Sequence, residues 1–180
     1  MRNVNWNDVQ DDIRRPVPGG YAAKITEVVD NEDKEYLLIR WEFADGEFKG
    51  CNQETFDAFG FWPIAFVKSY KQKALRFFKG FKTAVEESNR NYTFDCMNPA
   101  GLVGKFMGVV LGEEEYLDKE GKVKTRLYVD QVRSGKAIRE GDYKVPELKK
   151  LPAGAAAPVS ATTPMSNYAV LTDDDAELPF

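Results

Sequence analysis

The segment from residue 60 to residue 89 places the strongest constraint on the fold of this chain. Apolar residues recur there at three- and four-residue intervals from Phe66 to Val85, which is the spacing of one face of a helix. Pro63 suits a first helical turn, and Asn89 suits the end of a helix. Gly80 lies inside the pattern and costs about 1 kcal/mol relative to Ala in a helix. We therefore expect one central helix, with another element packed closely against Gly80.

The other side of this segment is basic. No Asp or Glu occurs between Ala58 and Val85. The cations of the segment are Lys68, Lys71, Lys73, Arg76, Lys79 and Lys82. Two interpretations stay open, a solvated helix face or a face that meets a polyanion.

Alternating apolar residues predict strands on both sides of the helix. They cover residues 21–29, 36–43 and, less regularly, 47–56 before the helix, and residues 102–111 and 122–132 after it. Asp45-Gly46 is a strong hairpin signal between the second and third strands. Three strands, a helix and two strands is the order of elements in an OB-fold, a small Greek-key barrel. The prediction is a mainly β (α+β) domain with one central helix, built as an OB-fold-like five-stranded barrel.

Composition divides the chain into four parts. Residues 1–18 form an N-terminal arm in which Trp6, Val9 and Ile13 have helix-compatible spacing, so we expect a short helix or an arm that docks through Trp6. Residues 19–150 form the OB-fold-like domain. Residues 151–172 are rich in Ala, Pro and Thr and are expected to be a disordered linker. Residues 173–180, DDDAELPF, form an acidic tip.

Several classes of function are disfavoured by composition. The chain has no His, and its two cysteines, Cys51 and Cys96, form neither a disulfide framework nor a zinc motif. The acidic clusters at residues 30–33 and 113–115 lie on predicted turns, where consecutive carboxylates do not converge on a metal. We therefore expect no cofactor and no enzymatic activity, with a nuclease as the least favoured alternative. With no apolar leader and no run of 18 apolar residues, we expect a cytoplasmic protein without a membrane partner.

Charge is distributed unevenly along the chain. The net charge is −4, from 29 acidic and 25 basic residues. Four of the acidic residues, Asp173, Asp174, Asp175 and Glu177, lie in the tip, so the remainder of the chain is balanced. The tip ends in an apolar side chain beside a carboxylate. Phe180 can fill an apolar slot while the upstream acids steer towards a basic rim.

The tip resembles the acidic C-terminal tip of bacterial single-stranded-DNA-binding proteins. Asp173, Asp174, Asp175, Pro179 and Phe180 match that pattern, and Ala-Glu-Leu interrupts it. In that family the fold is an OB barrel, and the tip recruits replication, recombination and repair proteins. The resemblance therefore implies a partner-binding set. Its members are Asp173, Asp174, Asp175, Leu178, Pro179 and Phe180.

The body resembles a family of small proteins from phages and integrated elements of Gram-positive bacteria. The stretches that carry the resemblance are GGYAAKIT (19–26), GFW (60–62), SYKQKALRFFKGFKTAVEESN (69–89), LVGKFMGVVLGEEEY (102–116) and KTRLYVDQVRS (124–134). Members are commonly regarded as phage single-strand-binding proteins. The resemblance implies a single-stranded DNA partner in replication or recombination.

Candidate DNA contacts combine cations with flat rings, because a base stacked on an aromatic side chain contributes about 1–3 kcal/mol. One parity of the last strand carries Lys124, Arg126 and Tyr128, opposite Leu127 and Val129. The further candidates are Tyr36, Arg40, Lys105, Phe106 and Arg133. Lys68, Lys71, Lys79 and Lys82 form an additional basic surface that faces DNA, the acidic tip or only solvent.

The sequence thus favours non-catalytic single-stranded DNA binding, with a tip that recruits host or phage replication and recombination proteins. The alternative is a protein–protein adaptor or recombination accessory protein whose OB-like domain binds protein. Homo-oligomerisation, a preference for DNA over RNA and the site size stay open.

Overall fold

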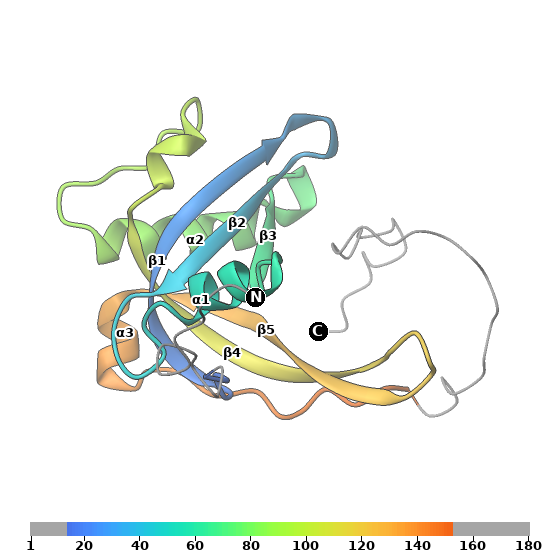
Figure 1. The fold of residues 1–180 in the computed structure, drawn as a ribbon. Coiled ribbons are helices and arrows are strands. Elements are labelled where there is room, and N and C mark those ends of the chain that lie inside the picture. Colours follow the sequence, from blue (N-terminus) through green and yellow to red (C-terminus); the bar gives the residue numbers. More distant parts are fainter. Residues whose placement is uncertain (1–13, 153–180) are drawn as a thin grey trace, which may run out of the picture.

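Five antiparallel strands form one sheet, in the order β3-β2-β1-β4-β5 (Figure 1), in the computed structural model of the chain, which describes residues 14–152. The strands are β1 (Gly19–Asn31), β2 (Tyr36–Phe43), β3 (Ala65–Ser69), β4 (Phe106–Leu117) and β5 (Val123–Arg133). The helices are α1 (Cys51–Phe59), α2 (Leu75–Ser88) and α3 (Gly135–Glu140), with 3-10 turns η2 (Glu32–Lys34), η3 (Gln72–Ala74) and η4 (Pro99–Leu102). The predicted mainly β class with some helix is confirmed.

The core lies between one face of this sheet and α2. Leu37, Ile39, Trp41 and Phe43 alternate along β2 and are buried, as predicted from their parity. From α2, Phe81 and Val85 are buried in the same cluster. Residues of one parity on β2 and of one stripe on α2 therefore build one apolar interior.

Two long hairpins, β1–β2 and β4–β5, extend from the body on the same side (Figure 1). β1 joins the two hairpins, because its first part, from Gly19 to Lys24, pairs with β4 and its part from Ala23 onward pairs with β2. The pairing of β1 with β2 shifts register between Ile25 and Glu27. Such an irregularity bends a strand, which lets β1 pair with β2 of one hairpin and with β4 of the other.

The expected closed barrel is not formed. β3 and β5 are the two edges of the sheet, and no ladder joins them within residues 14–152. Register supplies the physical reason, because Lys68 of β3 pairs with Leu37 and so has the parity that faces the core. A barrel closed over Lys68 would bury an ammonium group, which is costly without a partner. The side of the sheet between β3 and β5 therefore stays open.

The predicted third strand at residues 47–56 is wrong, because Cys51–Phe59 is helix α1. The Glu42 carboxylate accepts hydrogen bonds from the backbone N–H groups of Asn52 (3.1 Å) and Gln53 (2.7 Å) in the first turn. A carboxylate is stabilised at this end of a helix, where N–H groups lack partners. Asn52 also donates to the Trp41 carbonyl at 2.9 Å. β2 thus holds α1 in place by contacts that cross ten residues of chain.

The predicted central helix is correct only in its second half. α2 begins at Leu75, whereas Ala65–Ser69 is strand β3, paired with β2. Phe66 lies opposite Ile39 in this ladder and packs edge-on against Phe81, with ring centroids 6.1 Å apart. The helical spacing of Phe66 with later residues is therefore a coincidence, since two different elements bury these rings in one core.

The end of the chain also differs from the prediction. β4 continues through Glu113–Glu115 to Leu117, beyond the strand predicted to end at residue 111, because β5 pairs with it along this length. Residues 134–150, for which no helix or strand was predicted, begin with α3. A Cβ on Gly108 would lie 2.3 Å from Ile138 of α3, and one on Gly20 would lie 2.3 Å from the Tyr143 ring. Only glycine lets this C-terminal segment lie directly on the sheet.

The prediction that an element packs closely against Gly80 is wrong, because a Cβ built there meets no atom within 4 Å. We therefore expect Gly80→Ala to stabilise the domain by about 0.5–1 kcal/mol, through the loss of backbone freedom in the unfolded chain. Urea unfolding followed by circular dichroism measures this change. Gly20→Ala is the control. It should lower the free energy of unfolding, because its methyl group would collide with Tyr143. A destabilised Gly80→Ala variant would contradict the prediction.

Candidate nucleic-acid interface

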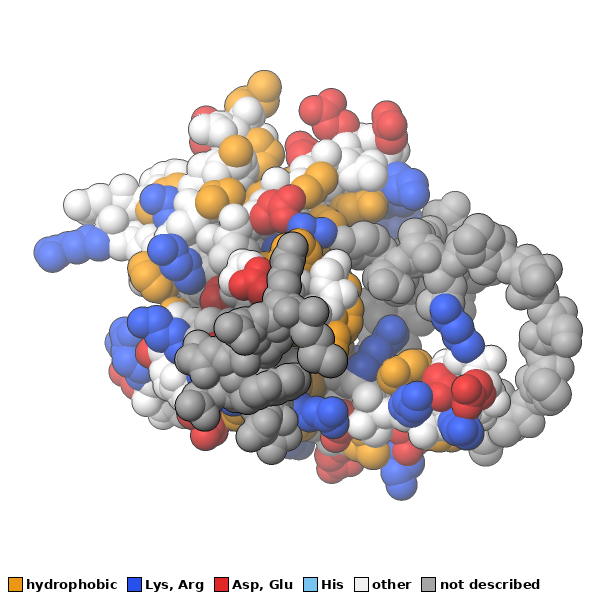
Figure 2. Space-filling model, viewed as in Figure 1, with side chains coloured by type: hydrophobic (Ala, Val, Ile, Leu, Met, Phe, Trp, Pro, Cys, Tyr) orange, Lys and Arg blue, Asp and Glu red, His pale blue; other side chains and the backbone are white. Residues whose placement is uncertain are grey.

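The cations predicted on one face of the last strand do share a face of β5, but they have carboxylate partners. Lys124 and Arg126 are registered with Tyr116 and Glu114 of β4. Lys124 forms an ion pair with Asp118 at 2.8 Å, and Arg126 forms one with Glu114 at 2.7 Å. Figure 2 shows basic and acidic side chains intermixed along this hairpin. A phosphate that binds here would have to compete with these carboxylates.

Tyr128, the predicted stacking ring on the same face, is half covered by the chain itself. The Lys149 ammonium lies 3.9 Å from the ring centroid. A Cβ on Gly112 would lie 2.8 Å from the ring and 2.6 Å from Pro146. Lys149 is held by backbone hydrogen bonds to Glu113 (3.0 Å) and from Glu115 (2.8 Å). Burial raises the pKa of the Tyr128 phenol, as expected for a ring that is not freely exposed.

Tyr36 and Arg40 lie on the face of β2 opposite the core, as their parity predicts. Both are half-buried. The Arg40 guanidinium forms an ion pair with Glu27 at 2.6 Å, and the Tyr36 hydroxyl accepts a hydrogen bond from Asn31 at 3.3 Å. This pair is therefore engaged within the β1–β2 hairpin.

Lys105 and Phe106 form part of an exposed patch of cations and rings at the start of β4. Phe106 is 47% exposed, and the Lys24 ammonium lies 5.9 Å from its ring centroid. The Lys105 ammonium lies 4.6 Å from the Tyr92 ring. Asn89 fixes the Phe106 backbone through two hydrogen bonds, of 2.7 and 2.9 Å. Sequence analysis missed Lys24 here, because only the pairing of β1 with β4 brings it opposite Phe106.

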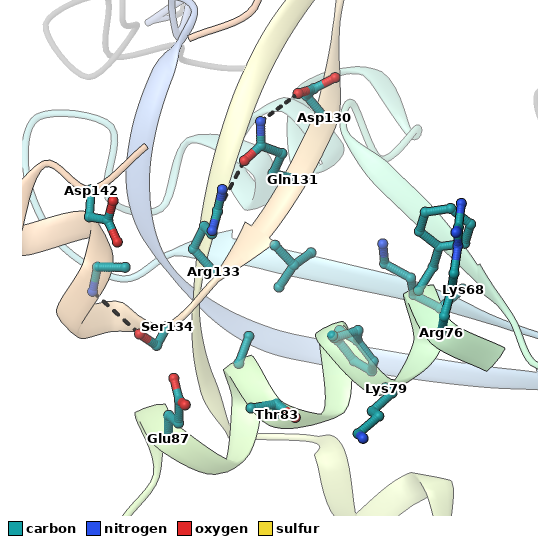
Figure 3. A pocket seen from close by; sticks show the side chains of 16 residues that line it. Lys68, Arg76, Lys79, Thr83, Glu87, Asp130, Gln131, Arg133, Ser134 and Asp142 are labelled. Atoms are coloured by element: carbon teal, nitrogen blue, oxygen red, sulfur yellow. Dashed lines mark hydrogen bonds between the residues drawn. The ribbon is translucent and has the colours of Figure 1, made fainter. Parts of the chain in front are cut away.

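A groove of about 790 Å³ lies along α2, on the open side of the sheet between β3 and β5. Its walls come from α2, the ends of β3 and β5, and α3 (Figure 3). The basic residues that line it are Lys68, Arg76, Lys79 and Arg133. They come from three different elements, β3, α2 and β5, that border the open side of the sheet.

The four groove cations have no ion-pair partner in the part of the chain that the structure describes, although the carboxylates of Glu87, Asp130 and Asp142 line the same groove. None of them belongs to an ion pair within residues 14–152. Lys68, Arg76 and Lys79 lie towards one end in Figure 3, whereas Glu87 and Asp142 lie towards the other. Charge therefore differs between the two ends of the groove, and the end at β3 and the start of α2 is positive.

Two of the groove cations, one at each end, are prepared to bind an anion: Lys68 at the positive end and Arg133 towards the end where Asp142 lies (Figure 3). Burial lowers the pKa of Lys68, which shows that water only partly solvates its ammonium. The Arg133 Nε donates to Gln131 at 3.0 Å, and Gln131 donates to Asp130 at 3.1 Å, so the guanidinium is oriented by a short chain of hydrogen bonds (Figure 3). A cation held in place loses less freedom when it binds a phosphate.

An exposed ring adjoins these cations. Phe77 lines the groove and is 49% exposed, and the Arg76 guanidinium lies 4.6 Å from its ring centroid. Phe77 lies within the segment in which apolar spacing predicted a buried helix face, and Arg76 was not among the predicted DNA contacts. The adjacent pair Phe77-Phe78 carried the missed signal, since two successive helix residues cannot both face one core.

The predicted additional basic surface divides into parts. Lys68 and Lys79 line the groove, whereas Lys71 is exposed in the connection between β3 and η3. Lys82 forms an ion pair with Glu86 at 2.8 Å. Only two of the four cations are therefore candidates for one shared site.

The partner-binding set of the tip lies outside the described residues. So does the N-terminal arm as far as residue 13. Among residues 14–152, no three His, Cys, Asp or Glu side chains are grouped to hold a metal ion. In the same residues, no helix is both long and apolar enough to cross a membrane.

Comparison with known proteins gives no match to a protein-family model or to a curated protein sequence. The resemblance to phage single-strand-binding proteins therefore stays a prediction.

Proposed function

We propose that this protein binds single-stranded DNA without catalysing a reaction, and that the strand lies in the α2 groove. The observation that carries the proposal is that Lys68, Arg76, Lys79 and Arg133 line one groove, beside the exposed ring of Phe77, and that none of them has an ion-pair partner within residues 14–152. Cations that follow a backbone, next to a ring that accepts a base, are the combination by which proteins hold single strands.

The ring favours a single strand over a duplex. An aromatic side chain stacks on the face of a base, and in a duplex that face is covered by the neighbouring base pair. Phe77 lies on the groove wall next to Arg76, so a phosphate and its base can be bound one after the other. A purely ionic patch would hold duplex and single strand alike.

We further propose that the domain is an open variant of the OB-fold. The neighbours in the sheet, β3-β2-β1-β4-β5, leave β3 and β5 at the two edges, and these edges approach one another without pairing. In this proposal the missing β3–β5 ladder creates the binding groove. The proposed biological setting, replication or recombination of a phage or mobile element, rests on the sequence resemblance alone.

The test is a fluorescence titration of labelled oligo-dT and of a duplex of equal length. We expect measurable oligo-dT binding at 50 mM salt and at least tenfold weaker duplex binding. Four phosphate contacts predict a slope of log K against log salt of about −3, since each contact on a single strand contributes about −0.7. The absence of oligo-dT binding at 50 mM salt, or equal affinity for duplex, would overturn the proposal.

Lys68 predicts a pH dependence of this binding. Its pKa is lowered by burial, so the ammonium is charged below that lowered value and neutral above it. The contribution of Lys68 to oligo-dT affinity should therefore be present below that lowered pKa and should be lost as the pH rises through it. In Lys68→Arg the charge persists, because guanidinium does not titrate in this range, so the fall in affinity should shift to higher pH. Titrations at constant ionic strength measure both proteins, and identical pH profiles would exclude Lys68 from the interface.

For the tip, we propose recruitment of replication or recombination proteins through Asp173, Asp174, Asp175, Leu178, Pro179 and Phe180. Deletion of the last three residues should abolish capture of such a partner and should leave oligo-dT affinity equal or higher. Loss of DNA binding on deletion would contradict a modular tip.

A further inference from the structure

Exposed aromatic rings gather at the C-terminal end of α1. Phe56, Phe59 and Phe61 are 37, 60 and 46% exposed. The Phe59 and Phe61 rings stack with centroids 6.0 Å apart, and Phe56 lies 5.9 Å from Trp62. Gly60 has φ +75° and ends the helix, which brings Phe61 back beside Phe59. A contiguous cluster of exposed rings marks a surface that another segment covers.

The charge around this ring cluster does not suit nucleic acid. α1 carries Glu54 and Asp57 and no Lys or Arg. A phosphate backbone beside these rings would meet carboxylates. The occupant is therefore an apolar segment that needs no positive surface.

The chain enters the described structure at the start of α1, the helix whose other end carries this cluster. Arg14, the first described residue, donates hydrogen bonds to the carbonyls of Glu47 and Lys49 and forms an ion pair with Glu54 of α1. The Cys51 thiol donates to the Arg14 carbonyl at 2.9 Å. The first described residue is thus bound to the first turn of the helix that carries the rings.

Two buried polar atoms, one on α1 and one on a residue that contacts α1, lack partners within the described residues. They are the second carboxylate oxygen, Oε2, of Glu54 and the indole Nε1 of Trp62. The first needs a donor and the second needs an acceptor, and a buried polar atom is normally paired. One backbone segment laid across α1 could supply both through its N–H and C=O groups.

We propose that residues 1–13 dock in cis on this cluster, with Trp6 against Phe56, Phe59 and Phe61. The length of the arm permits this placement. Trp6 is eight residues from Arg14 and can lie about 26 Å from it when the chain is extended. The helix measures only about 12 Å from Cys51 to Phe59. Trp6, Val9 and Ile13 supply the apolar side, so this docking is independent of the proposed DNA binding and should resist high salt.

The experiment uses disulfide formation in the full chain. Asn7→Cys places a thiol next to Trp6, and Ala58→Cys places one on the exposed surface of α1 without removing a ring. The native exposed Cys96 is the internal competitor, and Cys51 is buried. After equilibration in glutathione buffer, mass spectrometry of the digested protein gives the ratio of the 7–58 to the 7–96 disulfide. We expect a ratio of at least ten, unchanged in 1 M NaCl.

Two matched substitutions in this background show whether Trp6 carries the contact. Trp6→Ala should lower the ratio about tenfold, and Val4→Ala, outside the apolar spacing, should leave it unchanged. A ratio near one, or a ratio insensitive to Trp6→Ala, would overturn the proposal. Predominant intermolecular disulfides at low protein concentration would assign the surface to a second copy. A ratio that falls when oligo-dT is added would assign it to DNA bases, and either result overturns docking in cis.

Discussion

Replacement of both Arg76 and Arg133 by Ala should lower the affinity for oligo-dT about 100-fold at 50 mM salt. The two guanidinium groups come from α2 and from the end of β5, and they line opposite walls of one groove. A phosphate contact of this kind contributes about 1.5 kcal/mol, close to a factor of ten each. The slope of log K against log salt should become shallower by about 1.4, since two contacts are lost. Fluorescence titration over a range of salt concentrations measures both quantities.

The matched control is Lys124→Ala with Arg126→Ala, which also removes two cations. Asp118 and Glu114 neutralise these cations in the structure, so we expect less than a threefold loss of affinity. If this control instead loses as much affinity as the groove variant, the strand crosses the β5 surface that parity alone predicted. If neither variant loses affinity, both surfaces are excluded.

The sequence predicts those parts of the fold that depend on local pattern. β2 is the best example, since its bounds and its buried set both follow from the alternation between Tyr36 and Phe43. One face of β2 is covered by α2 and the other is not. Apolar and polar residues therefore alternate along the strand, because successive side chains point to opposite faces. The parity of Lys124 with Arg126 on β5 is predictable for the same reason.

Elements that depend on distant contacts are not predictable in this way. Glu42 of β2 accepts hydrogen bonds from the first turn of α1. The sequence of residues 47–56 alone does not predict this interaction, because Glu42 lies outside it. β3 is short, and its apolar residues continue in phase with those of α2. Phe66 and Phe81 share a core although they belong to different elements. Periodicity within one window cannot separate these cases, because it records burial and not the partner.

The candidate site follows the same rule. Parity places Lys124 and Arg126 on one surface, but the carboxylate that neutralises Arg126 lies on β4 and is known only from the register. The groove cations are spread over 66 positions of sequence, from Lys68 to Arg133, and line one groove that β3 and β5, the two edge strands, border. Whether the two edge strands pair depends on contacts between segments that are distant in sequence. The alternation of apolar residues within one β-strand does not show whether that strand pairs with a distant one.

Phe81→Ala should destabilise the domain by about 3–5 kcal/mol, the largest effect that we expect for a single residue of α2. Phe81 is 2% exposed and packs edge-on against Phe66 and Phe78, at centroid distances of 6.1 and 5.9 Å. Its removal leaves a cavity between the helix and β3, and a large core ring replaced by Ala costs this much. Small domains have about 5–15 kcal/mol in total, so the variant should unfold at a much lower urea concentration.

Phe77→Ala, one turn earlier on the same helix, separates folding from binding. Phe77 is 49% exposed and belongs to the groove wall. Its loss should change the free energy of unfolding by less than about 0.5 kcal/mol, while oligo-dT affinity falls about 5- to 100-fold with the loss of one base stack. Urea unfolding and DNA titration of both variants measure the two effects. If Phe77→Ala unfolds as easily as Phe81→Ala, the two rings are both part of the core. If Phe77→Ala is stable and binds DNA normally, the ring does not stack on a base and the path of the strand must leave α2.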